Sequence, residues 1–231
     1  MSELSEIALL SLKVAGVGVV FAMPLAFVIA YILARWRFPG RILLSALVMM
    51  PLVMPPVVSG LVLLELFGPR GVIGAWLGNF GIQFGFRWTG AALAAGFVAL
   101  PLMVRPMRLA LESVDYKLHE ALAVAGLGPW RRLLVLDLPM ALPGIIAGLV
   151  LGFAKGLGEF GATITFVASI PGETRTLSLA IYSALQSAQS GQLVFILSAV
   201  SIGISILAIL ASEIMVENIG RKLGRGRVNI A

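Results

Sequence analysis

The sequence contains no cysteine, a single histidine and few charged side chains. Without cysteine the chain forms no disulfide, and the lone His119 excludes the cysteine and histidine clusters that bind zinc. Only 12% of the 231 residues are Asp, Glu, Lys or Arg, about half the share that is usual in soluble proteins. This number of charges is too small to cover the surface of a soluble domain. Water is therefore not the main solvent of this chain.

Long apolar runs take the place of the missing charges: 59% of the residues are hydrophobic, and the mean hydropathy is +1.02. A helix that crosses a bilayer needs about 20 mostly apolar residues. Such runs predict five spans, over residues 14–34, 42–64, 88–104, 143–166 and 193–212. We therefore predict an all-α, polytopic membrane helical bundle, with a transmembrane domain over residues 7–213 and a basic cytoplasmic tail over residues 214–231.

The basic residues are distributed unevenly among the connections. Twelve of the 17 Lys and Arg residues follow the first, third or fifth predicted span, and only three lie on the opposite side. Because cytoplasmic loops are enriched in Lys and Arg, this distribution predicts an external N-terminus, a cytoplasmic C-terminus and a cytoplasmic loop over residues 105–142. The net charge of +6 thus reports topology, and no nucleic-acid partner is expected.

Prolines are frequent inside the predicted spans, at Pro24, Pro51, Pro55, Pro56 and Pro101. Each removes a backbone donor and tends to kink a helix, a defect that neighbouring helices can compensate in a membrane. Kinked packing explains these prolines, and so does a gated pathway lined by broken helices. In the fourth span, two glycines at positions 148 and 152 would allow another helix to approach closely.

The cytoplasmic loop contains signals for two helices separated by a turn. Asp115 stands where an N-cap is expected, and Gly126 where a left-handed residue would end the first helix. Pro129 is well placed to begin the second helix. His119 is predicted to lie on the polar face of the first helix. On the pattern alone, an amphipathic segment lying on the lipid surface remains an alternative.

The same loop resembles the cytoplasmic motif of ABC-importer permeases, which reads E-A-A, three residues, G, nine residues, I, one residue, L-P. The matching residues are Glu120, Ala121, Gly126, Leu138 and Pro139. Two positions differ conservatively, with Leu122 in place of alanine and Leu136 in place of isoleucine. In that family the loop forms a coupling helix that docks onto the ATPase subunit. The resemblance implies this role for residues 115–138, and a type I ABC importer permease fold.

Further stretches, at 50–61, 101–115, 142–148 and 158–176, are similar to molybdate permease subunits. The resemblance implies import of molybdate, with tungstate as a second substrate. Sulfate permeases share the G-E-F-G-A element, so a sulfate or tungstate permease is the alternative. The family implies a bacterial inner-membrane location and a complex with a second copy of the chain, two ATP-binding subunits and an external solute-binding protein.

The chain has no G-x-x-x-x-G-K-[ST] loop, so ATP hydrolysis is expected in a separate subunit that binds ATP-Mg. The chain itself is not expected to be an enzyme or to bind a cofactor or metal. A secondary transporter is a further alternative, although no internal repeat supports it. Lys155 and Glu159 lie four residues apart in the fourth predicted span, on one helix face and well inside the membrane. They are predicted to form a salt bridge that is either structural or part of the translocation pathway.

Overall fold

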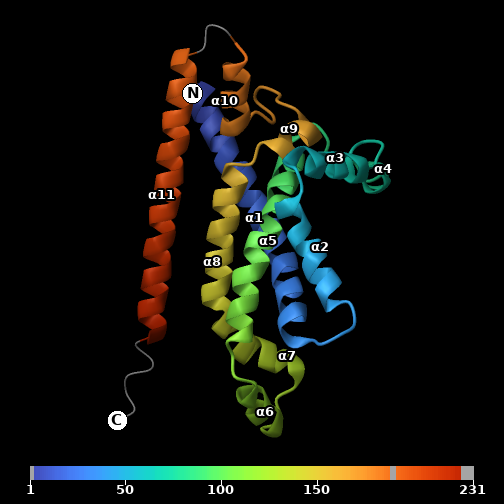
Figure 1. Cartoon of the computed structure of the whole chain (residues 1–231), viewed down its shortest axis with the longest axis vertical. Coiled ribbons are helices and arrows are strands. Elements are labelled where there is room, and N and C mark those ends of the chain that lie inside the picture. Colours follow the sequence, from blue (N-terminus) through green and yellow to red (C-terminus); the bar gives the residue numbers. More distant parts are fainter. Residues whose placement is uncertain (1–2, 188–190, 225–231) are drawn as a thin grey trace.

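The computed structural model describes residues 3–187 and 191–224, and all the regular elements in these ranges are helices (Figure 1). The longest helices are α1 (Glu3–Arg35), α5 (Trp88–Glu112), α8 (Leu138–Leu157) and α11 (Gly191–Gly224). The shorter helices are α2 (Arg41–Val53), α3 (Pro56–Phe67), α4 (Val72–Gly78), α6 (Tyr116–Val124), α7 (Pro129–Arg132), η1 (Leu133–Asp137, a π-helix), α9 (Gly161–Val167) and α10 (Leu177–Leu185). Four of the described helical segments are long and apolar enough to cross a membrane, or five if α2 and α3 form one bent span.

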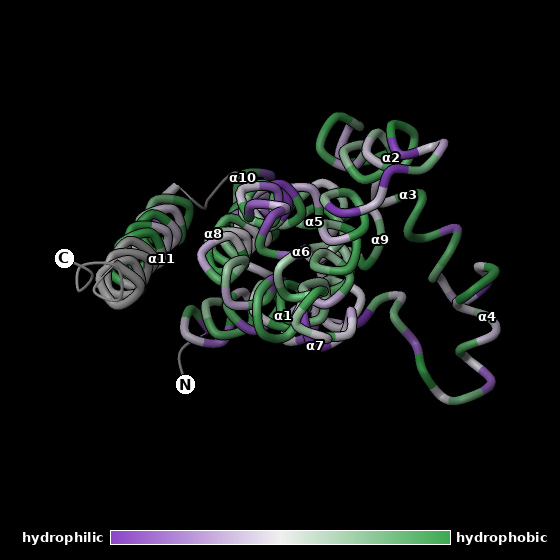
Figure 2. Tube along the Cα trace, turned by 90° about the horizontal axis from the view of Figure 1, so that it is seen from below, coloured by the Kyte–Doolittle hydropathy of each residue, from purple (hydrophilic) through white to green (hydrophobic). Residues whose placement is uncertain are grey.

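Helices α1, α5 and α8 form the centre of the bundle (Figure 1). Met103 and Met107 of α5 are fully buried there, together with Ala30 and Leu33 of α1. Helix α11 lies at one edge of the bundle, where Figure 2 shows it apart from the centre. Only 6% of the residues in its most apolar stretch are buried, against 67% in α5, so most of its apolar side chains remain uncovered, although Leu197 is buried in a cluster with α10.

Glycines allow the central helices to approach each other closely. A methyl group on Gly96 of α5 would lie 2.6 Å from the Gly18 carbonyl oxygen of α1. On α8, a methyl group on Gly148 would lie 2.9 Å from the Met103 carbonyl oxygen, and one on Gly152 would lie 2.8 Å from the Met103 Cγ atom. The predicted close approach at positions 148 and 152 is therefore confirmed, with α5 as the partner helix.

This packing predicts different effects for two glycines of α1. Gly18→Ala would push a methyl group into the backbone of α5 and should destabilise the fold by about 1 to 3 kcal/mol. Gly16→Ala is the matched control, because a methyl group there meets no atom within 4 Å. Thermal unfolding in detergent should show a lower Tm for Gly18→Ala and an unchanged or slightly higher Tm for Gly16→Ala. Equal Tm values for the two variants would contradict the close packing.

The second predicted span, 42–64, is not one continuous helix but two helices joined by a sharp bend. Helix α2 ends at Val53, and α3 begins at Pro56 with its axis turned by 113°. Met54 and Pro55 each precede a proline, which disfavours the α conformation, and both are extended, with ψ of 145° and 132°. Helix α3 then lies against α9, where a methyl group on Gly60 would lie 2.6 Å from the Ala162 carbonyl oxygen.

The fourth predicted span, 143–166, differs from the structure at both ends. Helical structure begins at Pro129 and runs through α7, η1 and α8 to Leu157, and α9 is a separate helix. The prediction began the span at Pro143 and carried it through Gly158, but Pro143 lies inside α8 and Gly158 ends it. The helices extend beyond the other predicted spans: α1 starts before residue 14, and α5 continues past residue 104 to Glu112. Charged residues are poor boundary markers because helices extend into the headgroup region.

Candidate functional site

The predicted loop helix is present as α6, at the lower end of the bundle beside α7 (Figure 1). The Asp115 carboxylate accepts a hydrogen bond from the Lys117 backbone N–H at 2.9 Å, which caps the start of α6 as predicted. At the other end, Gly126 has a φ of +81°, in the left-handed region. The N–H of Gly126 donates to the Ala123 carbonyl and the N–H of Leu127 to the Leu122 carbonyl, which is the Schellman motif.

The loop exposes large apolar side chains rather than burying them. None of the residues of α6 is buried, and Tyr116, Val124 and Trp130 are 70%, 90% and 76% exposed. Exposed aromatic and aliphatic groups on a polar loop are characteristic of a surface that binds another protein. Because the turn at Gly126 fixes the angle between α6 and α7, it also sets the relative positions of Val124 and Trp130.

The five predicted motif residues occupy three places in this loop. Glu120 and Ala121 are exposed on α6, Gly126 forms the turn, and Leu138 and Pro139 begin α8. The structure thus places the motif within α6, in the turn that follows it and at the start of α8. A docking role for these residues remains a prediction.

Sequence reasoning missed Asp137, which is the last residue of η1. Its side chain is 1% exposed, and its Oδ1 atom accepts a 2.5 Å bond from the Arg35 guanidinium at the end of α1. The His119 Nε2 atom of α6 lies 3.1 Å from the same oxygen. A carboxylate at an otherwise apolar stretch, L-L-V-L-D-L-P, is the one sequence signal that could have indicated a buried charge.

The expectation that His119 lies on a polar face was wrong, since its side chain is only 12% exposed and faces Asp137. Burial lowers the pKa of His119, the charges of Arg35 and Arg132 lower it further, and the Asp137 carboxylate opposes this shift. The imidazole is therefore neutral at pH 7. The Arg132 guanidinium also donates to the His119 carbonyl oxygen at 3.4 Å, which links α6 to α7.

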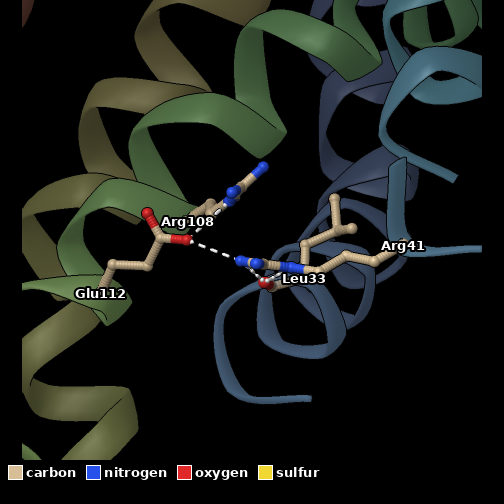
Figure 3. A network of polar contacts seen from close by, with 4 residues as sticks. All are labelled: Leu33, Arg41, Arg108 and Glu112. Atoms are coloured by element: carbon tan, nitrogen blue, oxygen red, sulfur yellow. Dashed lines mark hydrogen bonds and ion pairs between the residues drawn. The ribbon is translucent and has the colours of Figure 1, made fainter. Parts of the chain in front are cut away.

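A second polar network joins α1, α2 and α5 near the same end of the bundle (Figure 3). The Arg41 guanidinium donates two bonds to the Leu33 carbonyl, at 2.9 and 2.6 Å, and satisfies an oxygen that the end of α1 leaves free. Arg41 also lies 3.1 Å from the Glu112 carboxylate, which pairs with Arg108 at 2.9 Å. This network is about one-third exposed and does not include a residue of α6 or α7.

Lys155 and Glu159 meet as predicted, but not on one helix. Lys155 is in the last turn of α8, and Glu159 follows the end of that helix, so the lysine lies near one end of the segment and not well inside it. The Lys155 Nζ atom is 3.2 Å from Glu159 Oε2, while Glu159 Oε1 accepts a 3.0 Å bond from the Ala162 N–H of α9. The pair therefore connects α8 to α9. Its role in a pathway remains a prediction.

The family described as the inner membrane component of binding-protein-dependent transport systems matches residues 22–225. The chain belongs to this family. It is 46% identical to the molybdenum transport system permease protein ModB of Haemophilus influenzae, over 98% of this chain and 99% of that protein. It is 47% identical to ModB of Escherichia coli, over 95% of this chain and 96% of that protein.

Solved structures show the same fold. This permease superposes on a bacterial ABC transporter that imports the acidic polysaccharide alginate with a TM-score of 0.70, at 18% identity, over 100% of this chain and 81% of that one. An amino acid ABC transporter superposes with a TM-score of 0.65, at 16% identity and 94% coverage of both chains. The predicted fold class, an all-α type I ABC importer permease, is thereby confirmed. Members of this family are multi-pass proteins of the inner membrane.

Proposed function

We propose that the chain is the transmembrane permease subunit of an ATP-driven importer of molybdate, with tungstate as a second substrate. The observation that carries this proposal is the 46–47% identity, over nearly the whole length, to permeases named for molybdenum transport. The sulfate permease CysT of Escherichia coli is 38% identical over 78% of this chain and only 64% of CysT. The higher sequence identity to the molybdenum permeases, over a larger share of both chains, favours molybdate over sulfate as the substrate.

The complex that we propose contains two copies of this chain, two ATP-binding subunits on the cytoplasmic side and one external solute-binding protein. The family description itself specifies dependence on a binding protein. A related alginate transporter was solved in complex with its substrate-bound periplasmic protein. Because the chain lacks a nucleotide-binding loop, ATP-Mg binds in the partner subunits. A homodimer supplies enough helices to enclose a pathway along a two-fold axis.

Within this complex, α6 and α7 form the surface that docks onto the ATPase. The exposed Val124 and Trp130 side chains supply apolar contact area, and the turn at Gly126 holds the two helices at a fixed angle. The motif residues Glu120 and Ala121 lie on the same helix. ATP-driven movement of the ATPase subunits is transmitted through this loop to the bundle, where the Lys155–Glu159 pair is a candidate part of the anion pathway.

Topology provides a separate prediction, because the positive-inside distribution places α4 outside and α6 inside the cell. The chain has no cysteine, so single cysteines can be introduced without a background. Asn79→Cys, at the end of α4, should react with a membrane-impermeant maleimide in intact spheroplasts. Gly128→Cys, in the cytoplasmic loop, should react only after the membrane is opened. The reverse pattern would contradict the proposed orientation.

ATP dependence distinguishes an importer of this class from a secondary transporter. The permease should be reconstituted in proteoliposomes with its ATPase and binding protein, and uptake of labelled molybdate measured. Uptake should require ATP together with the binding protein and should persist when ion gradients are collapsed by ionophores. Uptake that follows an ion gradient without ATP would refute the proposed mechanism.

A further inference from the structure

Among the described residues, Asp137 has the most buried charged side chain, with only 1% of it exposed. Neighbouring residues Leu134 and Val135 are 61% and 62% exposed, so the apolar side chains point outward and the carboxylate points inward. The π-helix η1 accounts for this inverted arrangement, because its wider turn changes which residues face the core. A buried carboxylate between apolar neighbours requires charged or polar partners to offset its desolvation.

Those partners come from two elements far apart in the sequence. Arg35 is the last residue of α1, whereas His119 lies in the middle of α6. Both contact the same oxygen of Asp137, at 2.5 and 3.1 Å, with 15% and 12% of their own side chains exposed. The three side chains border a cavity of about 700 Å³ that Tyr31 also lines. Asp137 is therefore a joint between the first long helix and the docking helix.

The position of α6 relative to the bundle depends strongly on this joint. Helix α6 has no buried residue, so apolar packing does little to hold it in place. Two polar contacts connect it to other elements, namely the His119–Asp137 contact and the bond from the Arg132 guanidinium to the His119 carbonyl. A helix held mainly by a few polar contacts reorients when those contacts are lost.

We propose that Arg35, Asp137 and His119 form a positioning cluster that transmits movement of α6 to the end of α1. This inference rests on the proposed function of α6 as the docking helix, and it names the bundle helix that receives the movement. In this role the three residues do not contact the transported anion or ATP. They keep α6 and α1 in a fixed relation, so that a displacement of the docked ATPase displaces α1 as well.

The test measures how many anions are transported for each ATP that is hydrolysed, in proteoliposomes that contain the complete complex. Asp137→Asn keeps the shape of the side chain and removes its charge, and His119→Leu removes the contact from α6. In both variants the ATPase should still bind and hydrolyse ATP, while the transport ratio falls by about fivefold or more, the lower range of measured coupling between sites. Arg35→Lys should retain most of the ratio and Arg35→Gln should lose it, because only the former keeps the charge.

Glu112→Gln is the matched control, since it breaks ion pairs at the same end of the bundle without contacting α6 or α7. Its transport ratio should equal that of the unmodified protein. An unchanged ratio in His119→Leu would overturn the proposal, and His119 lies on a helix without buried residues, so this variant should still fold. Parallel losses of hydrolysis and transport would also overturn it, because they indicate a purely structural role.

A second measurement does not depend on the transported substrate. Spin labels on Arg37→Cys and Lys117→Cys, both exposed positions, report the distance between the end of α1 and α6. The distance distribution should be narrow in the otherwise unmodified chain and clearly broader with Asp137→Asn. If the complex carried no oxyanion at all, the proposed function would fail while this measurement would still test the cluster. An unchanged distance distribution would refute the proposal that Asp137 holds α6 and the end of α1 in a fixed relation.

Discussion

A permease with Gly126→Val is expected to insert into the membrane normally but to lose most of its transport activity and its affinity for the ATPase. Gly126 has a φ of +81°, where a β-branched residue is strained by about 1 to 3 kcal/mol. Relief of that strain would open the Schellman turn and change the angle between α6 and α7. Since 1.4 kcal/mol is a factor of ten in binding, ATPase affinity should fall by roughly tenfold or more.

Two controls separate backbone strain from a simple increase in side-chain size. Gly126→Asn should retain most activity, because asparagine tolerates the left-handed region better than other residues with a side chain. Gly128→Val lies in the same loop at a φ of −66°, and an added methyl group there meets no atom within 4 Å. It should also retain activity. Pull-down of the ATPase with each variant measures the effect, and normal binding by Gly126→Val would contradict the proposed turn.

The second large effect is expected at the Lys155–Glu159 pair. Glu159 is 2% exposed, so Lys155→Met would leave a buried carboxylate without its cation and should cost about 3 to 5 kcal/mol. Glu159→Gln should cost less, because Lys155 is 34% exposed and the amide oxygen can still accept the bond from Ala162. The double variant removes both charges and should be more stable than Lys155→Met alone.

Thermal unfolding and uptake together determine the role of this pair. If the double variant folds and assembles but does not transport, the pair belongs to the anion pathway. If it transports normally, the pair is structural. A Lys155→Met variant as stable as the unmodified protein would show that the carboxylate has another partner in the assembled complex, contrary to this account.

Local patterns predicted the helix–turn–helix loop but not its attachment to the bundle. Asp115, Gly126 and Pro129 specify their own backbone conformations, so the caps and the turn could be recognised in the sequence. The cluster of Arg35, His119 and Asp137 joins residues up to 102 positions apart, and no local pattern specifies such a contact. The π-helix that turns Asp137 inward also has no recognised sequence signature here.

The helices in the membrane show the same division between local and tertiary causes. The run over 42–64 was apolar enough for one span, and its prolines indicated a kink, but no local pattern indicated a turn of 113° or the packing of α3 against α9. In the fourth predicted span, the sequence correctly predicted the contact between Lys155 and Glu159. The end of α8 at Leu157 was not predicted. It depends on the backbone conformation of Gly158 and on the hydrogen bond from the Ala162 N–H to Glu159, which form only in the folded arrangement.

Competition for uptake tests most directly whether this permease carries molybdate. Proteoliposomes that contain the permease, its ATPase and its binding protein should be given ATP and labelled molybdate. Excess unlabelled molybdate or tungstate should abolish uptake of the label, while equal excess of sulfate should leave it nearly unchanged. Uptake of labelled sulfate that persists in excess molybdate would contradict the assignment.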